Sequence, residues 1–307
     1  ARPYGSPLQR RQEALAAAAK FENLFGAIAR LELGRWGEIN PAAIQEAIEA
    51  VQRQEWQIEE NLLGLWMILQ AYSTHPSFPE HLRPAIKQAL IDYPYQNVTN
   101  PLSDACTIQN LAAEVLAGQW FPEEVFTASG KNGAWHRLHG EQQAQAWIIE
   151  KGELGLWPWN VGQDWPGILL ALAQIATHAD SVDLTDLAVV LLDKMLFLLA
   201  VNSFKGSFAA SQGRASAASL KSSQLEATSG VSRLLWGMGV YNDFIAGLIG
   251  LACSEYEYPA FFQQIASQIP ESFLHREKIA SGREENVQTV HLVTYKTPDF
   301  QLSSAQD

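Results

Sequence analysis

The sequence predicts an all-α fold of roughly ten helices, with the start of a β unit at the C-terminus. Two observations support the helices: apolar residues recur three and four positions apart through most of the chain, and the alternation typical of half-buried strands is almost absent. A third concerns the C-terminus, where Val287, Val290, Leu292, Val293 and Tyr295 have high β propensity. At 307 residues the chain can form one large domain or two ordinary ones.

The apolar spacing predicts a helix over residues 8–34 and a long amphipathic helix over residues 41–73. Asn40 and Pro41 are a suitable cap and first residue for the second helix, and Glu55 is the one exception to its apolar spacing. The other predicted helices cover residues 83–93, 102–117, 142–150, 166–178, 184–203, 230–241, 243–254 and 259–268.

The remaining segments suggest two domains, a helical one over residues 1–280 and the beginning of a β domain over residues 281–307. Since a lone strand is unstable, we expect the natural protein to continue past Asp307 into a C-terminal β domain. Residues 203–230 are rich in Ser, Ala and Gly, which is typical either of a flexible surface loop or of an ordered loop over a site.

Charge and motifs exclude several classes of function. With 21 Lys and Arg against 33 Asp and Glu the formal charge is −12, which argues against a nucleic-acid partner. No apolar run is long enough to span a bilayer, so we do not expect a membrane to be a partner of this protein. Phosphate-binding loops, zinc-finger spacings and the Gly-x-Ser-x-Gly motif are missing from the sequence. Nucleotide-dependent and serine-hydrolase functions therefore have no support in these motifs, and we expect neither a cofactor nor a metal.

The stretch over residues 152–167 is the first candidate site, because its glycines and prolines separate two helical segments and carry three tryptophans. Trp157, Trp159 and Trp165 offer flat faces on which a sugar ring could stack, with Asn160 and Asp164 as polar neighbours. The alternative is a buried plug that seals two helices.

Asn110 and Glu114 form a polar stripe, four residues apart on an otherwise apolar helix. They either contact substrate in a central cleft or bond to a neighbouring helix end. His136 and His139 flank Arg137 and could supply a general base, or one of them could cap a helix that starts near Glu141.

From Asn110 to Phe208 the chain resembles the helical-toroid half of heparinase-like and alginate-lyase-like polysaccharide lyases and their uncharacterised bacterial relatives. The pieces that carry the resemblance lie within about a third of the chain; they are Asn110, residues 116–122, 129–133 and 155–160, the helix with Leu169, Leu172 and Ala176, and residues 188–206 and 211–216. It implies an incomplete (α/α) toroid followed by a β-sandwich, and it favours a secreted or periplasmic protein.

The resemblance also implies β-elimination of uronate-containing glycans, in which an asparagine neutralises the uronate carboxylate and a Tyr or His removes the C5 proton. Asn110 would then be the neutraliser, Trp159 and Asn160 would form a cleft wall, and Arg214 would contact a substrate anion. His136, His139, Tyr95 and Tyr241 are the candidate bases.

The chain departs from the family pattern at four positions, because Leu111, Pro158, Gln212 and Ser216 stand where relatives carry a His, a Glu, a His and a Tyr. Two alternatives therefore stand beside a lyase that acts on a polysaccharide or oligosaccharide. One is a glycoside hydrolase on the same scaffold, with Glu114 and Asp164 as its two carboxylates. The other is a non-catalytic module that binds glycan or another domain.

Overall fold

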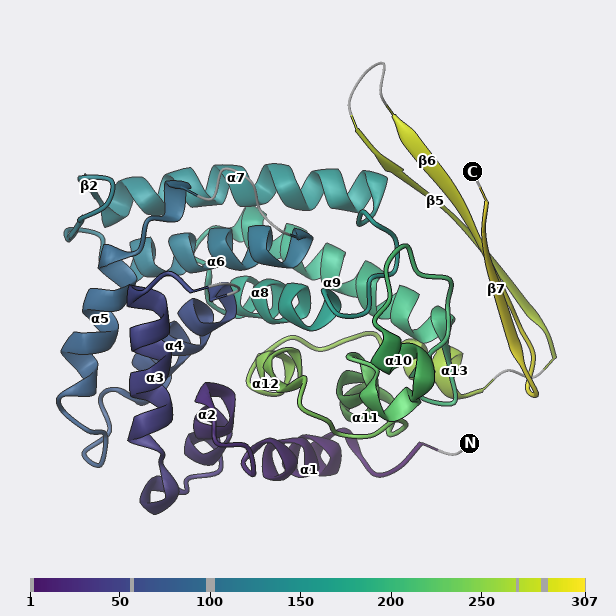
Figure 1. The fold of residues 1–307 in the computed structure, drawn as a ribbon, viewed down its shortest axis with the longest axis horizontal. Coiled ribbons are helices and arrows are strands. Elements are labelled where there is room, and N and C mark those ends of the chain that lie inside the picture. Colours follow the sequence, from purple (N-terminus) through teal and green to yellow (C-terminus); the bar gives the residue numbers. More distant parts are fainter. Residues whose placement is uncertain (1–2, 56–57, 98–102, 269–270, 283–286, 307) are drawn as a thin grey trace.

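The computed structural model describes residues 3–55, 58–97, 103–268, 271–282 and 287–306. These residues form a mostly helical fold with a small antiparallel sheet near the C-terminus (Figure 1). The α-helices are α1 (Pro7–Ala18), α2 (Leu24–Glu32), α3 (Pro41–Gln52), α4 (Glu59–Tyr72), α5 (Leu82–Asp92), α6 (Asp104–Trp120), α7 (Gly133–Leu154), α8 (Trp165–His178), α9 (Val182–Asn202), α10 (Ala217–Lys221), α11 (Ser229–Trp236), α12 (Ile245–Ala252) and α13 (Phe261–Ser267). The short 3₁₀ helices are η1 (Trp36–Glu38), η2 (Tyr95–Asn97) and η3 (Ser223–Leu225).

Five helices form a closed circuit in the middle of the molecule. Helix α2 contacts α4, α4 contacts α6, α6 contacts α8, α8 contacts α12, and α12 contacts α2. Other helices lie outside this circuit: α1 packs on α2 and α12, α3 and α5 on α4, α7 on α6, and α9 on α8. Figure 1 shows α7 along one edge of the molecule, α1 along the opposite edge and α12 between them.

Glycine allows α6 and α7 to pack closely. A Cβ atom added at Gly118 would lie 2.5 Å from the backbone nitrogen of Arg137 and 2.6 Å from the carbonyl oxygen of Gly133. Because both neighbours are backbone atoms, no side-chain rotation could relieve the overlap, and the two helices would have to separate.

We therefore expect Gly118→Ala to lower the free energy of unfolding by about 1–3 kcal/mol, the usual cost of overpacking. Gly152→Ala is the matched control on α7, since nothing lies within 4 Å of its added Cβ. The control should raise stability by about 0.5–1 kcal/mol through helix propensity. Urea denaturation followed by circular dichroism measures both, and equal effects of the two variants would refute the close-packing argument.

The C-terminal sheet has the order β5–β6–β7, with β5 (Phe273–Ser281), β6 (Gln288–Lys296) and β7 (Gln301–Gln306) all antiparallel to their neighbours. Its register pairs Ile279 with Val290 and Leu292 with Ala305. Lys296 joins the sheet to the helices, because its buried amino group donates to the carbonyls of Ala200 and Val201 near the end of α9. Burial lowers the pKa of Lys296 to about 8. Two short hairpins pair β1 (Val125–Phe126) with β2 (Lys131–Asn132) and β3 (Ser203–Phe204) with β4 (Ser207–Phe208).

The mostly helical class is confirmed, but several predicted element boundaries were wrong. The predicted helices over residues 8–34 and 41–73 are each two helices, and the helix expected near Glu141 begins at Gly133. The first strand of the sheet starts at Phe273, before the proposed domain boundary. The Ser-rich segment over residues 203–230 contains β3, β4 and α10.

The two breaks have local physical causes. Between α3 and α4 the backbone takes a positive φ of 50° at Gln54, which a continuous helix does not allow. Between α1 and α2 the buried guanidinium of Arg30 donates to the carbonyls of Ala19 and Phe21. These carbonyls are thus bonded outside any helix, and the chain can turn between the two segments.

Candidate active site

A cleft of about 610 Å³ opens where the amino-terminal ends of the five circuit helices meet. Most of the residues that line the cleft lie on or just before the first turns of those helices, and the cation Arg214 comes from a loop. The lining includes Phe25, Glu60, Cys106, Gln109, Gln163, Asp164, Arg214, Asp243 and Phe244. Helices α4, α8 and α12 start without a side-chain hydrogen bond at their caps. Backbone N–H groups at such ends are suited to bind oxygen atoms of a ligand.

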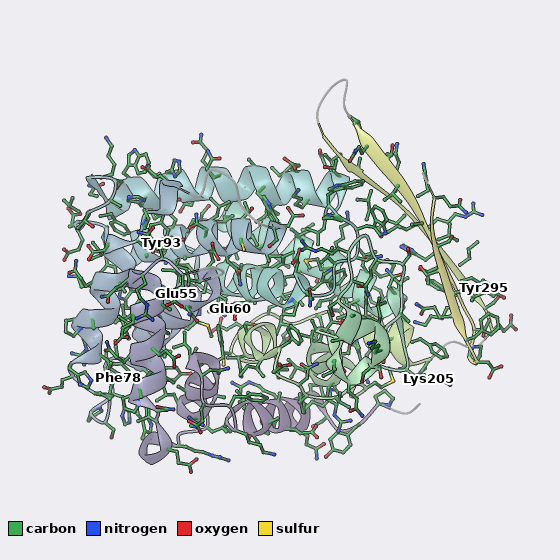
Figure 2. The ribbon with its side chains drawn as sticks, in the orientation of Figure 1. Glu55, Glu60, Phe78, Tyr93, Lys205 and Tyr295 are labelled. Carbon is green, nitrogen blue, oxygen red and sulfur yellow. The ribbon has the colours of Figure 1, made fainter. Side chains whose placement is uncertain are left out.

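Two carboxyl groups of the cleft have raised pKa values. Burial, followed by repulsion from Glu59, raises the pKa of Glu60 to about 7. Burial also raises the pKa of Asp164, although attraction to Arg214 opposes that rise. Glu60 lies in the first turn of α4 near the middle of the molecule (Figure 2), while Asp164 precedes the first residue of α8. The raised pKa favours the protonated form of Glu60, whereas Asp164 has a cation beside it.

Arg214 is held over the cleft by the tryptophan-rich loop. Its guanidinium lies 3.3 Å from both carboxylate oxygens of Asp164. The backbone of Gly213 donates to the carbonyl of Trp159 at 2.8 Å, and the side chain of Asn160 donates to the carbonyl of Ser211 at 3.1 Å. Four predicted site residues, Trp159, Asn160, Asp164 and Arg214, therefore form one connected unit.

The three tryptophans of this loop pack into the protein. Trp157 and Trp159 contact each other edge to face and pack against the small core of the sheet, which contains Ile279, Val290 and Leu292. Trp165 is buried against Phe208. This packing agrees with the plug interpretation for Trp165 and places the other two between sheet and helices, so sugar stacking on them stays a prediction.

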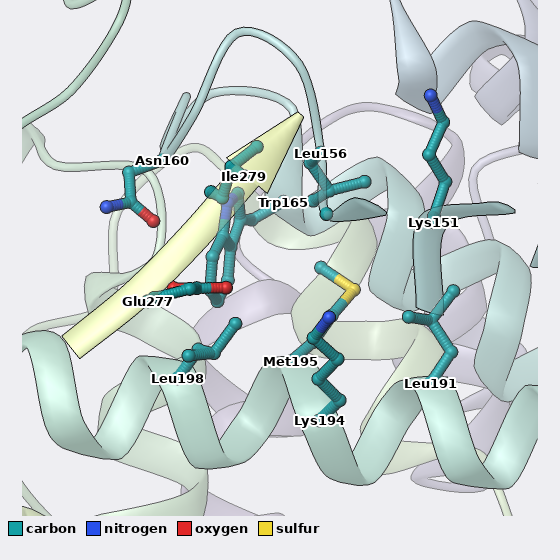
Figure 3. A pocket seen from close by; sticks show the side chains of 11 residues that line it. Lys151, Leu156, Asn160, Trp165, Leu191, Lys194, Met195, Leu198, Glu277 and Ile279 are labelled. Atoms are coloured by element: carbon teal, nitrogen blue, oxygen red, sulfur yellow. The ribbon is translucent and has the colours of Figure 1, made fainter. Parts of the chain in front are cut away.

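Figure 3 shows a small cavity beside this loop, lined by Leu156, Asn160 and Trp165 together with Glu277 and Ile279 of β5. Its volume of about 20 Å³ is enough for roughly one water molecule and too small for a sugar. The cleft at the helix ends, at about 610 Å³, is large enough for a sugar.

The polar stripe of α6 faces outward, toward α7 and η2. Asn110 donates to the backbone carbonyl of Tyr95 at 3.1 Å, and neither Asn110 nor Glu114 is among the residues that line the cleft. Glu114 Oε1 lies 2.7 Å from His136 Nδ1 and 3.1 Å from His139 Nδ1. The structure thus brings five predicted site residues together in a second cluster, between α6 and α7.

Ser129 completes this second cluster and was given no role in the sequence prediction. Its Oγ lies 2.6 Å from His136 Nε2, so both ring nitrogens of this buried histidine have partners. Tyr95 packs against the same ring, but its hydroxyl donates to the carbonyl of Leu90, and burial raises its pKa well above the usual range. A Tyr with such a high pKa is poorly suited to act as a base.

Tyr241 lies apart from both groups. Its hydroxyl donates to the carbonyl of Arg10 and to Glu13, and it lines a separate hollow with Glu13 and Arg233. Tyr241 is absent from the described residues that line the cleft. Tyr241 is therefore not placed to act as the base for a substrate bound in the cleft.

Sequence reasoning missed Glu60 and Gln109 as cleft residues. The available signal for Glu60 was the interruption at Glu55, which indicated a helix break and hence a new helix start at the two acids Glu59 and Glu60. Gln109 gave no such signal. Its position on the inner side of α6 follows only from how α6 packs against α8.

Comparisons with protein-family models, curated proteins and solved structures found no match. None of the helices in the described part of the chain is both long and apolar enough to cross a membrane. Among the described residues no group of three or more His, Cys, Asp or Glu side chains could hold a metal ion.

Proposed function

We propose that this protein is a carbohydrate-active enzyme that hydrolyses a glycan bound in the cleft at the helix ends. The observation that carries the proposal is the pair of carboxyl groups with raised pKa values, Glu60 on α4 and Asp164 at α8, in one cleft. In the same proposal the closed circuit of five helices is the inner ring of an incomplete (α/α) toroid, with the outer helices packed around it.

The two carboxyl groups have environments that suit different roles. Glu60 has Glu59 as its charged neighbour, which favours the protonated form, so Glu60 is the general acid that protonates the glycosidic oxygen. Asp164 has Arg214 as its charged neighbour, which favours the ionised form. Ionised Asp164 would assist the attacking water or stabilise the positive charge that develops on the sugar.

Polar groups around Glu60 and Asp164 are suited to form hydrogen bonds with the hydroxyl groups of a sugar. Gln109 and Gln163 each offer an amide that can donate and accept. The backbone N–H groups at the uncapped starts of α4, α8 and α12 add donors. Phe25 and Phe244 supply apolar surface in the same cleft.

The cleft composition favours hydrolysis over β-elimination of an acidic glycan. Among the described lining residues Arg214 is the one cation, against three acids, Glu60, Asp164 and Asp243. A polyanionic substrate would be repelled by such a lining. Glu114, expected at first to be one of the two carboxylates, has the two histidines of α7 as partners, and Glu60 takes its place in the proposal.

β-Elimination remains the second candidate, since Arg214 and the helix ends could bind a uronate carboxylate. A third possibility is a glycan-binding module without activity. The three are distinguished by their products: hydrolysis yields saturated reducing ends, elimination yields an unsaturated uronate that absorbs in the ultraviolet, and binding alone yields neither.

We expect a panel of neutral and uronate-containing polysaccharides to yield saturated reducing ends with the native protein and at least about 100-fold fewer per unit time with Asp164→Asn. Reducing-sugar release, ultraviolet absorbance and chromatography of the products measure the reaction. Asp183→Asn is the control, because Asp183 is an exposed acid in the first turn of α9, away from the cleft. An Asp164→Asn variant as active as the control would refute the role of Asp164. Binding of a glycan in calorimetry without any product would refute the proposed enzymatic activity.

A further inference from the structure

A serine, a histidine and a glutamate are lined up between α6, α7 and the hairpin that precedes α7. Ser129 Oγ lies 2.6 Å from His136 Nε2, and His136 Nδ1 lies 2.7 Å from Glu114 Oε1. This is the order of contacts in which a base activates a hydroxyl and a carboxylate orients the base. The cluster shares no residue with the lining of the cleft at the helix ends.

The hydrogen bonds fix which nitrogen of His136 carries the proton. A carboxylate only accepts hydrogen bonds, so Nδ1 of His136 donates to Glu114, and in the neutral histidine Nε2 accepts from the hydroxyl of Ser129. The Ser129 hydroxyl also lies 3.3 Å from the carbonyl oxygen of Phe126, a weaker competing acceptor. Both His136 and Glu114 are 1% exposed as side chains, and low dielectric surroundings strengthen such a charge-assisted pair. His139 also bonds to Glu114 and stacks on Trp135, which holds the carboxylate in place.

Of Ser129, His136 and Glu114, Ser129 is the one that is not fully buried. It lies half-buried in the turn between β1 and β2, and its neighbours Ala128 and Gly130 are exposed. The backbone N–H of Lys131 donates to Ser129 Oγ at 3.1 Å, which stabilises negative charge on that oxygen. Phe126 stacks on the ring of the buried His136.

We propose that Ser129 is the nucleophile of a second active site, with His136 as its general base and Glu114 as the residue that orients His136, and that its substrate class is carboxylic esters. His136 Nε2 takes the hydroxyl proton as Oγ bonds to the ester carbonyl carbon. The alcohol leaves with that proton, and an acyl-serine remains. A water molecule then gives a proton to His136 as it attacks the acyl carbon, and the carboxylic acid leaves while Ser129 regains its proton.

The test is covalent labelling of the native chain with a fluorophosphonate, which phosphonylates activated serines with loss of fluoride. We expect one adduct per chain, located on Ser129 by peptide mass spectrometry and absent in Ser129→Ala. His136→Gln should slow labelling by about 100-fold or more, the usual contribution of a general base. Glu114→Gln should slow it as well, and hydrolysis of p-nitrophenyl acetate should fall in the same order.

Matched controls separate this site from general serine reactivity and from the cleft. Ser219→Ala removes another half-buried serine, whose Oγ bonds to Ser216 and has no histidine partner, and it should not change labelling. Asp164→Asn should label at the native rate, whatever its effect on glycans. Circular dichroism and Tm show which variants are folded; should the buried His136 prove essential for folding, Ser129→Ala and Glu114→Gln decide the matter. Labelling of native protein that is no faster than that of Ser129→Ala would overturn the proposal.

Discussion

Replacing Arg10 with alanine is expected to lower the free energy of unfolding by about 4 kcal/mol. The Arg10 side chain is fully buried. It donates to the carbonyls of Leu234 and Leu235 in α11, to those of Tyr4 and Gly5, and to the side chains of Tyr258 and Gln263. One guanidinium therefore ties the N-terminal helix to α11 and α13.

The cost arises from what the substitution leaves behind. Several buried acceptors would lose a charged donor, and each unsatisfied buried group costs about 1–3 kcal/mol, with incomplete additivity. The carbonyls of Leu234 and Leu235 lie in the last turn of α11, where a positive charge is stabilising. A lysine at position 10 should recover only part of the loss, because one ammonium group cannot reach partners on both sides.

Urea denaturation of Arg10→Ala, Arg10→Lys and Arg35→Ala measures these differences. Arg35 is the control, because its exposed side chain forms a surface ion pair with Glu38, so its loss should cost less than about 0.5 kcal/mol. A decrease below about 1 kcal/mol for Arg10→Ala would show that the carbonyls find other donors.

The contacts of Arg10 could not be predicted from the sequence, whereas several helices could. The predicted helix over residues 166–178 agrees closely with α8, because its apolar periodicity and flanking loops are local signals. The bond from Arg10 to Leu234 spans 224 residues and leaves no trace in either segment. Charged residues are usually exposed, so the residue type gives no indication that Arg10 is buried.

The candidate site shows the same difference between local sequence patterns, which can be read, and tertiary contacts, which cannot. The apolar surroundings of Asn110 and Glu114 predicted a polar stripe with a special role, and the structure gives both residues buried partners. Which way the stripe faces depends on the rotation of α6 in the circuit, and no local pattern encodes that rotation. Neither Asn110 nor Glu114 lines the cleft at the helix ends, where α6 contributes Cys106 and Gln109 instead.

Glu60→Gln is expected to make the protein more stable at pH 8 and less active at pH 6. The pKa of Glu60 is raised from 4.5 to about 7 by burial and by Glu59. For an acid whose folded pKa exceeds the unfolded value, folding is unaffected below pH 4.5, loses stability as pH rises from 4.5 to 7, and carries the full cost above pH 7. At about 1.4 kcal/mol per pKa unit, that cost is at most about 3 kcal/mol.

A glutamine has no charge to bury, so Glu60→Gln should match the native protein near pH 4 and exceed its unfolding free energy at pH 8 by up to about 3 kcal/mol. Thermal and urea unfolding across this pH range measure the difference. Glu46→Gln is the control, since Glu46 is exposed on α3 and its replacement should leave the pH dependence unchanged. The same stability difference at pH 4 and pH 8 would contradict the raised pKa.

Activity separates a catalytic acid from a carboxyl group that is merely buried. If Glu60 donates the proton to the leaving oxygen, native glycan hydrolysis should fall as pH rises above 7, and Glu60→Gln should lose at least about 100-fold in kcat at pH 6 with its fold intact. A buried carboxyl without a catalytic role would give the gain in stability alone. Loss of activity together with gain of stability is what a functional site predicts, because the protein keeps there a group that its own folding would be better without.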